Sequence, residues 1–430
     1  MNNNINKSAV QPIYFAILIS IGFLLGTYNN SLKTNNQYYK ILEVINAVNQ
    51  EYVDTVKTDK LVELAINGLL QGLDPHSYYI NSEDFTESND LLQGSFDGIG
   101  IQFRLEKDTI IVINTINGGP SEKVGLKAGD RIVKINGETV AGVKIKENEV
   151  IHKLKGPRGT KVQISVFRKN VKSLIDFTIT RDAIPVYSID VAYMILNDIG
   201  YIRISRFSAT TKDELIKELL SLKNKGMKKL ILDLRGNGGG YMDAAIDISN
   251  EFLFKGNTIV FTKGRNRKPE YFFANGKGHF QQGSLIVLID ELSASASEIV
   301  AGAIQDNDRG ILIGRRSFGK GLVQSQMTFK DGSAIRLTIA RYYTPSGRCI
   351  QRPYKDGTQN YYNDFYTHLL NNDIDTLKND SLKYKTIKGR TVYGGGGIMP
   401  DIVIPYEKDS LLYWFNEVNN LGLIYQFAFN

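Results

Sequence analysis

The sequence predicts a multidomain α/β protein. Its 430 residues exceed what one hydrophobic core usually holds, so two or three domains are expected. Three patterns follow one another: helical spacing near the N-terminus, short apolar runs between glycine turns from about residue 94, and alternating strand and helix patterns after Ile184-Pro185. The last pattern predicts a mostly parallel sheet with crossover helices.

The N-terminal 36 residues have the composition of a signal-anchor and linker. Lys7 precedes the apolar run Ile13–Leu25, and a polar, Asn-rich stretch follows over Gly26–Asn36. A short positive flank before such a run is typical of a signal peptide or a signal-anchor. No small-x-small cleavage site follows, which favours an uncleaved membrane anchor. We therefore expect the rest of the chain in the cell envelope, on the periplasmic or extracytoplasmic side.

Composition excludes several classes of protein. Hydrophobic residues at 42% and charged residues at 23% argue against a disordered or multi-span protein. Lys and Arg exceed Asp and Glu by 52 − 45 = 7, but they are scattered, which favours a solvated basic surface and no nucleic-acid partner. Cys349 is alone, so no internal disulfide forms, and the four histidines form no zinc-binding pattern. No metal site is expected.

Residues 37–93 are predicted to be helical and residues 94–182 β-rich. Leu61, Leu64, Ala65 and Leu69 recur at helix spacing, and the turn Leu73-Asp74-Pro75-His76-Ser77 follows them. The next segment has short apolar runs that predict strands, with one helix near Glu147–Leu154. The strands are expected at Ile99–Phe103, Ile110–Ile113, Arg131–Ile135 and Val162–Phe167.

Residues 183–430 are predicted to alternate between strands and helices. The expected strands are Ile199–Ile204, Leu230–Leu234, Leu285–Ile289 and Ile311–Ile313. The expected helices are Lys212–Lys223, Ala244–Phe252, Ala296–Gln305 and a closing helix near Leu411–Leu421. Glycine- or serine-rich turns follow three of the strands, and each turn could form part of a binding or catalytic site.

The first turn is Asp233–Gly240, between a strand and a helix. It nearly matches a dinucleotide fingerprint, but Tyr241 stands where the third glycine belongs. Its N–H groups could hold a pyrophosphate or form half of an oxyanion hole. A tight turn that needs positive φ explains the glycines equally well.

The second turn, Gly314–Gly321, matches the first seven positions of the phosphate-loop motif, G-x-x-x-x-G-K, but not the eighth. Gly321 stands where Ser or Thr would hold magnesium, and Leu322–Phe329 is predicted as a strand, not a helix. A nucleotide site is therefore not expected. Lys320 remains either a surface lysine or a functional one.

The third turn, Ser293–Glu298, opens a helix. Ser295 and Glu298 form the S-x-x-E pattern of a capping box. A serine there could also be a nucleophile, because the N–H of Ala296 would point at a bound carbonyl. No G-x-S-x-G elbow is present, and His279 has the sequence context of a surface histidine. A buried, neutral lysine can serve as the base, and Lys320 follows the next strand.

Taken together, these segments resemble the C-terminal processing peptidases, or tail-specific proteases. The resemblance rests on L-D-P-H-S at Leu73–Ser77, S-A-S-A-S-E at Ser293–Glu298, G-K-G-x-V-Q at Gly319–Gln324 and G-G-I-x-P-D at Gly396–Asp401. It implies a crotonase/ClpP-like α/β protease core over 183–430, a PDZ domain over 94–182 and a helical domain over 37–93. It also implies cleavage of protein substrates near their C-termini, without a cofactor.

The resemblance also implies roles for individual residues. Ser295 is the expected nucleophile and Lys320 the general base, at the family's spacing of 320 − 295 = 25 residues. Gln324 would orient Lys320, and Asp306 would be a supporting polar residue. The N–H groups of Ala296 and of Gly239 and Gly240 would form the oxyanion hole, although Gly238 replaces the family's usual proline.

The PDZ domain would capture the free carboxylate of a substrate tail at the loop Gly98-Ile99-Gly100-Ile101 and add the tail as a strand. Val150, Ile151 and Leu154 line the groove or belong to the module core. The alternative function, a binding protein and not an enzyme, is a catalytically silent PDZ adaptor that binds substrate tails for another protease. A homo-oligomer is left open.

Overall fold

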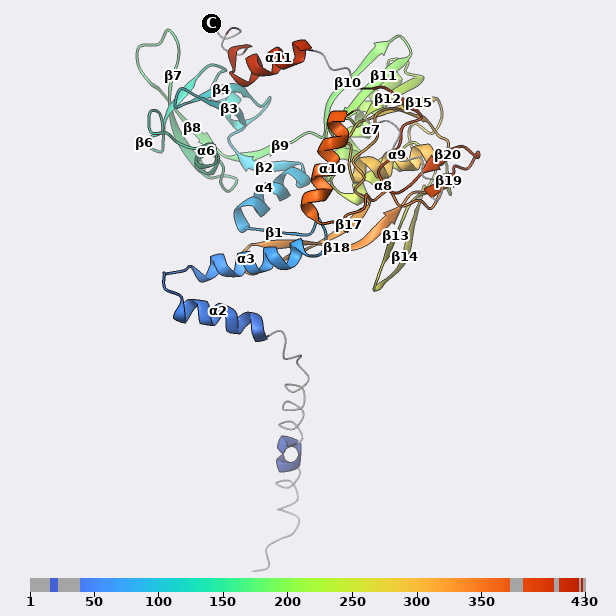
Figure 1. Cartoon of the computed structure of the whole chain (residues 1–430). Coiled ribbons are helices and arrows are strands. Elements are labelled where there is room, and N and C mark those ends of the chain that lie inside the picture. Colours follow the sequence, from blue (N-terminus) through green and yellow to red (C-terminus); the bar gives the residue numbers. More distant parts are fainter. Residues whose placement is uncertain (1–15, 22–38, 372–381, 406–409, 425–426, 428–430) are drawn as a thin grey trace, which may run out of the picture. The chain divides into compact units, whose positions relative to one another are not determined.

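The computed structural model describes residues 16–21, 39–371, 382–405, 410–424 and 427, and it mixes helices with strands (Figure 1). The chain divides after Leu73 into two compact units, which are described separately. The first contains α2 (Tyr39–Glu51) and α3 (Thr58–Gln71), as the helical spacing predicted.

The predicted anchor lies outside the described residues, apart from residues 16–21, which form exposed helix. Among the residues that can be described, none of the helices has the length and apolar character needed to traverse a bilayer.

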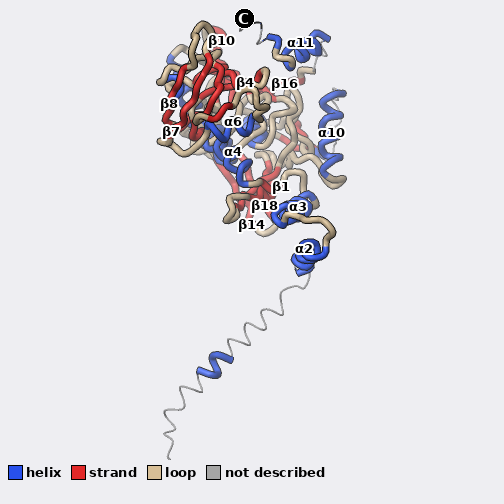
Figure 2. Tube along the Cα trace, turned by 90° about the vertical axis from the view of Figure 1, so that its left-hand side faces the viewer, coloured by secondary structure: helices blue, strands red, loops and turns tan. Residues whose placement is uncertain are grey.

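The second unit begins with β1 (Tyr78–Ile80) and α4 (Ser82–Gln93), and a β-rich module follows. Its sheet has the order β3-β4-β5-β7-β8, with β6 beside β5. The paired strands β7 and β8 lie side by side in Figure 2. The strands are β3 (Ile101–Glu106), β4 (Thr109–Thr115), β5 (Arg131–Ile135), β6 (Glu138–Thr139), β7 (Lys161–Phe167) and β8 (Ile175–Thr180). The short helix α5 (Pro120–Lys123) and the helix α6 (Glu147–Leu154) complete the module.

The ends of this module are joined by the pair β2 (Ser95–Gly98) and β9 (Asp182–Pro185), in which Gly98 lies opposite Asp182. The predicted strand Ile99–Phe103 was misplaced at its start, because Gly100 takes a φ of +72° and separates β2 from β3. Alternating apolar residues explain the core of the module, since every second residue of β7 (Val162, Ile164 and Val166) is buried.

The main sheet has the order β10-β11-β12-β15-β16-β21, and β10, β11, β12 and β15 lie side by side in Figure 1. All neighbours are parallel except β10 and β11, as the alternating pattern predicted. The strands are β10 (Ile189–Leu196), β11 (Ile199–Ile204), β12 (Lys229–Asp233), β15 (Ser284–Ile289), β16 (Ile311–Gly314) and β21 (Ile402–Val403). The crossover helices are α7 (Thr211–Asn224), α8 (Met242–Asn250) and α9 (Ala296–Asp306).

Helix α9 is buried along its whole length. Its small residues permit this, since a Cβ on Gly302 would lie 2.7 Å from the Thr344 side chain.

A second sheet has the order β1-β18-β13-β14, with β17 paired to β18. Its remaining strands are β13 (Thr258–Gly264), β14 (Arg267–Phe273), β17 (Leu322–Thr328) and β18 (Ala334–Tyr343). The C-terminal part contains the helices α10 (Thr358–Asn371) and α11 (Ser410–Asn420) and the hairpin of β19 (Lys383–Lys385) and β20 (Thr391–Tyr393). The strand predicted after the Lys320 loop is therefore confirmed as β17.

Candidate active site

Three parallel strands of the main sheet end at the same edge, and each leads into one of the predicted turns. Asp233 of β12 pairs with Leu288 of β15, and Ile289 pairs with Gly314 of β16. The carboxyl ends of such strands are where α/β sheets usually place their sites. The fold thus brings the glycine turn, the serine turn and the Lys320 loop together.

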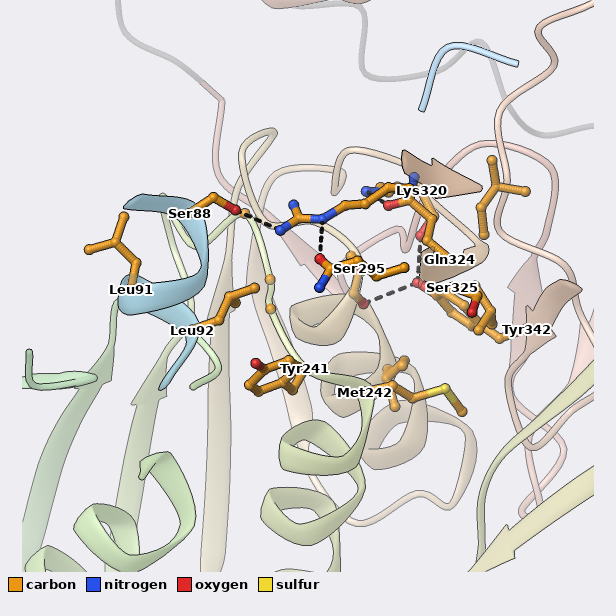
Figure 3. Close-up of a pocket in the computed structure, with 18 residues that line it drawn as sticks. Ser88, Leu91, Leu92, Tyr241, Met242, Ser295, Lys320, Gln324, Ser325 and Tyr342 are labelled. Atoms are coloured by element: carbon orange, nitrogen blue, oxygen red, sulfur yellow. Dashed lines mark hydrogen bonds between the residues drawn. The ribbon is translucent and has the colours of Figure 1, made fainter. Parts of the chain in front are cut away.

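A pocket of about 490 Å³ lies among these turns. Figure 3 shows Ser88, Leu91 and Leu92 of α4 at one side, Gln324 and Tyr342 at the other, and Ser295 between them. The pocket contains five of the predicted site residues: Ser295, Lys320, Gln324, Gly239 and Gly240.

Ser295 has a strained backbone immediately before α9. Its φ of +54° and ψ of −111° are unfavourable for a residue with a side chain, and such strain clusters at functional sites. The Ser295 N–H donates to Glu298 Oε2 at 2.8 Å, and Tyr342 Oη donates to the Ser295 carbonyl at 3.0 Å. These contacts hold the residue in the strained turn at the pocket wall.

Glu298 connects the serine turn with the Lys320 loop. Its carboxylate is fully buried and accepts four hydrogen bonds, from the Ser295 N–H (2.8 Å), Ser317 Oγ (2.5 Å), the Gly319 N–H (2.7 Å) and the Lys320 N–H (2.9 Å). Burial raises the pKa of Glu298, and the four donors oppose that rise. The S-x-x-E pattern had indicated only a helix cap.

Lys320 extends its amine into the same pocket. Its Nζ donates to Gln324 Oε1 at 3.1 Å. Burial lowers the pKa of Lys320, and the positive charge of Arg336 lowers it further, while Glu298 and Asp74 act in the opposite direction. A lysine in this environment loses its proton more readily than a surface lysine does.

Gln324 is held by the turn at residues 73–77, whose role sequence reasoning missed. Gln324 Nε2 donates to the carbonyl oxygen of His76. Asp74 shapes the turn by accepting from the N–H groups of His76 and Ser77, both at 2.9 Å, and from Ser77 Oγ at 2.6 Å. Thr338 of β18 donates to Asp74 at 3.1 Å and so fixes the turn to the sheet.

His76 is neutral at neutral pH in this structure. Burial and the nearby charges of Lys320 and Arg352 lower its pKa to about 3, against an opposing effect of Asp74. Its Nε2 lies 3.1 Å from Tyr361 Oη. The side chain therefore packs the turn, and only its backbone oxygen reaches Gln324.

The glycine turn passes directly against the serine turn. A Cβ on Gly239 would lie 2.9 Å from Ser295 Cβ and 2.8 Å from the Ala294 oxygen, so only glycine fits there. The Gly239 N–H, predicted to face an oxyanion, instead donates to Asn237 Oδ1 at 2.8 Å. In the described part of the chain, the N–H groups of Ala296 and Gly240 have no such acceptor.

Comparison with known proteins identifies the family of this site. The chain is 40% identical over 330 residues to the carboxy-terminal-processing protease of Bartonella bacilliformis, covering 76% of this chain and 75% of the relative. The chain belongs to peptidase family S41. The S41 family model matches residues 198–362, a PDZ domain model residues 98–179, and a model of the activating protease CtpB N-terminal domain residues 25–84.

Other relatives of this S41 protein were also found. It is 37% identical over 319 residues to the carboxy-terminal processing protease CtpA of Bacillus subtilis, covering 74% of this chain and 67% of the relative. A solved structure named photosystem II D1 C-terminal processing protease is 24% identical, covering 85% of this chain and 92% of that chain, with a TM-score of 0.43. The chain is a serine peptidase with a PDZ domain.

The PDZ domain of this S41 peptidase has a pocket of about 200 Å³ at its predicted groove. The loop Gly98-Ile99-Gly100-Ile101 lines it together with Ile151 and Leu154 of α6, and Leu91 of α4 lies beside them. Of the two alternatives left open for Val150, groove or core, the structure supports the core, because this side chain is fully buried there and does not line the pocket. Neighbouring helix residues are turned by about 100°, so Val150 and Ile151 face different ways.

Asp306 does not line the catalytic pocket. It ends α9, about 16 Å along the helix from Ser295 by the usual rise per residue. Its buried carboxylate pairs with Arg348 at 2.6 Å and accepts from Ser346 Oγ at 2.6 Å. It therefore supports the C-terminal segment of the S41 peptidase at a distance from the site.

Proposed function

We propose that the protein is an endopeptidase that uses Ser295 as nucleophile and Lys320 as general base to cut protein substrates near their C-termini. The observation that carries this proposal is the pocket itself. A strained serine at the start of a buried helix shares it with a lysine whose pKa is lowered, and one buried carboxylate, Glu298, holds both segments.

The chemistry proposed is acyl transfer. Neutral Lys320 accepts the proton of Ser295, whose Oγ attacks the scissile carbonyl, and the lysine then protonates the leaving amine. Gln324 holds the lysine in place. The N–H groups of Ala296 and Gly240 stabilise the oxyanion, and Gly239 provides the close backbone approach. Water then hydrolyses the acyl-enzyme, without a metal or organic cofactor.

The PDZ domain would bind the substrate tail. Strand β3 is an edge strand, pairing only with β4 among the described strands, so a peptide can extend the sheet there. The tail carboxylate would lie at the Gly98–Ile101 loop. The apolar residues Ile151 and Leu154 favour apolar side chains near the end of the tail.

The test uses the purified full chain and an unstructured protein that ends in apolar residues. We expect mass spectrometry to show cleavage near its C-terminus, and amidation of the tail to slow cleavage at least about 10-fold, because charge-assisted hydrogen bonds to the carboxylate are lost. Equal cleavage of both forms would contradict tail recognition. Binding without cleavage would favour the silent adaptor.

We also propose that residues 1–36 anchor the protein on the outer side of a membrane. The support is the run Ile13–Leu25 and the preceding Lys7. After alkaline carbonate extraction of membranes, the full chain is expected in the pellet and a variant without residues 1–36 in the supernatant. Release of the full chain into the supernatant would contradict the anchor.

A further inference from the structure

The catalytic pocket contains a second cationic side chain, Arg336, which the proposed mechanism does not use. Arg336 lies on β18, opposite Tyr78 of β1 and Gln326 of β17 in the register of the sheet. It lines the same pocket as Ser295 and Lys320. A cation that lines the same pocket as the proposed reacting groups interacts electrostatically with a substrate bound there.

In the part of the chain that the structure describes, the hydrogen-bond partners of the Arg336 guanidinium are all neutral. It donates to Tyr78 Oη at 2.7 Å, to Ser88 Oγ at 2.6 Å (the dashed line from Ser88 in Figure 3) and to Gln326 Oε1 at 3.3 Å. Within the described ranges, Arg336 forms no ion pair with a carboxylate. Since a guanidinium has five N–H groups, two remain for a ligand.

The side chains that line the pocket carry no negative charge, since the carboxylates of Glu298 and Asp74, which act on Lys320, are not part of the lining. Its 18 lining residues include Lys320 and Arg336 but neither aspartate nor glutamate. Arg336 is half-buried, and a cation partly removed from water is stabilised by a partner of opposite sign, which the pocket wall does not supply. The anionic group that a polypeptide substrate can bring is a carboxylate, and the planar fork of arginine matches its two oxygens.

The guanidinium is also held in place before substrate arrives. Its three hydrogen-bond partners come from three different elements, β1, α4 and β17, and the ring of Tyr78 lies 5.8 Å below it. A donor fixed in this way loses little freedom when a ligand binds.

We propose that Arg336 is a carboxylate-binding, specificity-determining residue of the catalytic pocket. Cleavage is then favoured where the substrate places a carboxylate beside the scissile bond. The carboxylate comes either from an aspartate or glutamate side chain or from the C-terminus of a short leaving segment. This inference rests on the proposed function, because it needs the pocket to hold the scissile bond.

The experiment is a cycle of enzyme and substrate variants. A peptide that the wild type cleaves is made with Asp or Asn at each of three positions on both sides of the scissile bond, and with a free or amidated end. The values of kcat/KM are compared for the wild type, Arg336→Gln, Arg336→Lys and Arg341→Gln. Arg341 is the matched control, since it is exposed on the same strand and outside the pocket.

We expect the wild type to prefer the carboxylate peptide over its neutral partner by at least about 10-fold, and Arg336→Gln to reduce that ratio to about one. Arg341→Gln should keep the wild-type ratio. Arg336→Lys keeps the charge without the fork, and its ratio should lie between the two, which preserves the test if Arg336→Gln does not fold. Assays at the plateau of the pH profile remove the separate effect of Arg336 on Lys320.

The source of the carboxylate follows from which peptide pair shows the Arg336-dependent ratio, the Asp and Asn pair or the acid and amide pair. A wild-type ratio near one in all pairs overturns the inference. So does a ratio that survives in Arg336→Gln, since the preference then arises elsewhere, as in the PDZ groove. If the initial search finds no peptide that the wild type cleaves, the proposed function is overturned, and this inference with it.

Discussion

Replacing Ser295 or Lys320 with alanine is expected to lower kcat for peptide cleavage by at least about 10⁴-fold, as removal of a nucleophile or its base does in serine proteases. Ser295→Ala removes the attacking oxygen, and Lys320→Ala removes the group that accepts its proton. Because the two act as a unit, the double variant should be hardly slower than either single one. Steady-state kinetics with a peptide substrate measure the effect.

Two variants on α7, outside the pocket, are matched controls: Ser221→Ala and the exposed Lys217→Ala. Both should keep wild-type rates, and circular dichroism should show the same fold for all four single variants. Residual activity of Lys320→Ala within about 10-fold of the wild type would assign the base to another group.

The same pair of residues predicts the pH dependence. Only the neutral amine of Lys320 can accept the serine proton, so kcat/KM should rise with pH and level off above the pKa of Lys320. Because burial and Arg336 lower this pKa below its ordinary value of 10.5, half of the maximum should be reached below pH 10.5. A rate that falls as pH rises would contradict a lysine base.

Replacing Glu298 with alanine is expected to abolish activity and to lower the free energy of unfolding by about 3–5 kcal/mol. The change would leave four buried donors without an acceptor, including the N–H groups of Ser295 and Lys320. Both segments of the pocket would then lose their common partner. Urea unfolding and the peptide assay measure the two effects.

Glu298→Gln is the conservative comparison, because the amide keeps the shape but accepts at only one oxygen. It should therefore lie between the wild type and Glu298→Ala in stability and in activity. Glu270→Ala, on the exposed face of β14, should change the free energy of unfolding by less than about 0.5 kcal/mol. Wild-type activity in Glu298→Ala would show that the carboxylate does not hold the two segments.

The position of the site could be predicted because its parts follow consecutive strands. Asp233, Ile289 and Gly314 end or adjoin three neighbouring strands, and the turn after each lies within a few residues. Parallel strands place such turns at one edge whatever the details of packing. Ser295, Lys320 and the glycine turn thus came together in one pocket.

Which helix residues line the groove of the PDZ domain could not be predicted from the sequence. Apolar residues at 150, 151 and 154 predicted the helix α6, but not which side of it faces the peptide. A helix turns by about 100° per residue, so its orientation depends on how it packs on the sheet. Packing buried Val150 in the core and left Ile151 at the groove.

The sequence by itself determined the order of modules and the strands that end at the site, because these depend on local spacing and on short patterns. Its resemblance to the C-terminal processing peptidases indicated the proposed nucleophile and base. Only the tertiary structure decided what surrounds them. The contact of Gln324 with His76 spans 248 residues, Arg336 meets Ser88 across the same separation, and Glu298 reaches the loop beyond the next strand. Contacts of this kind depend on which side chains the packed sheets bring face to face, and no local pattern specifies that.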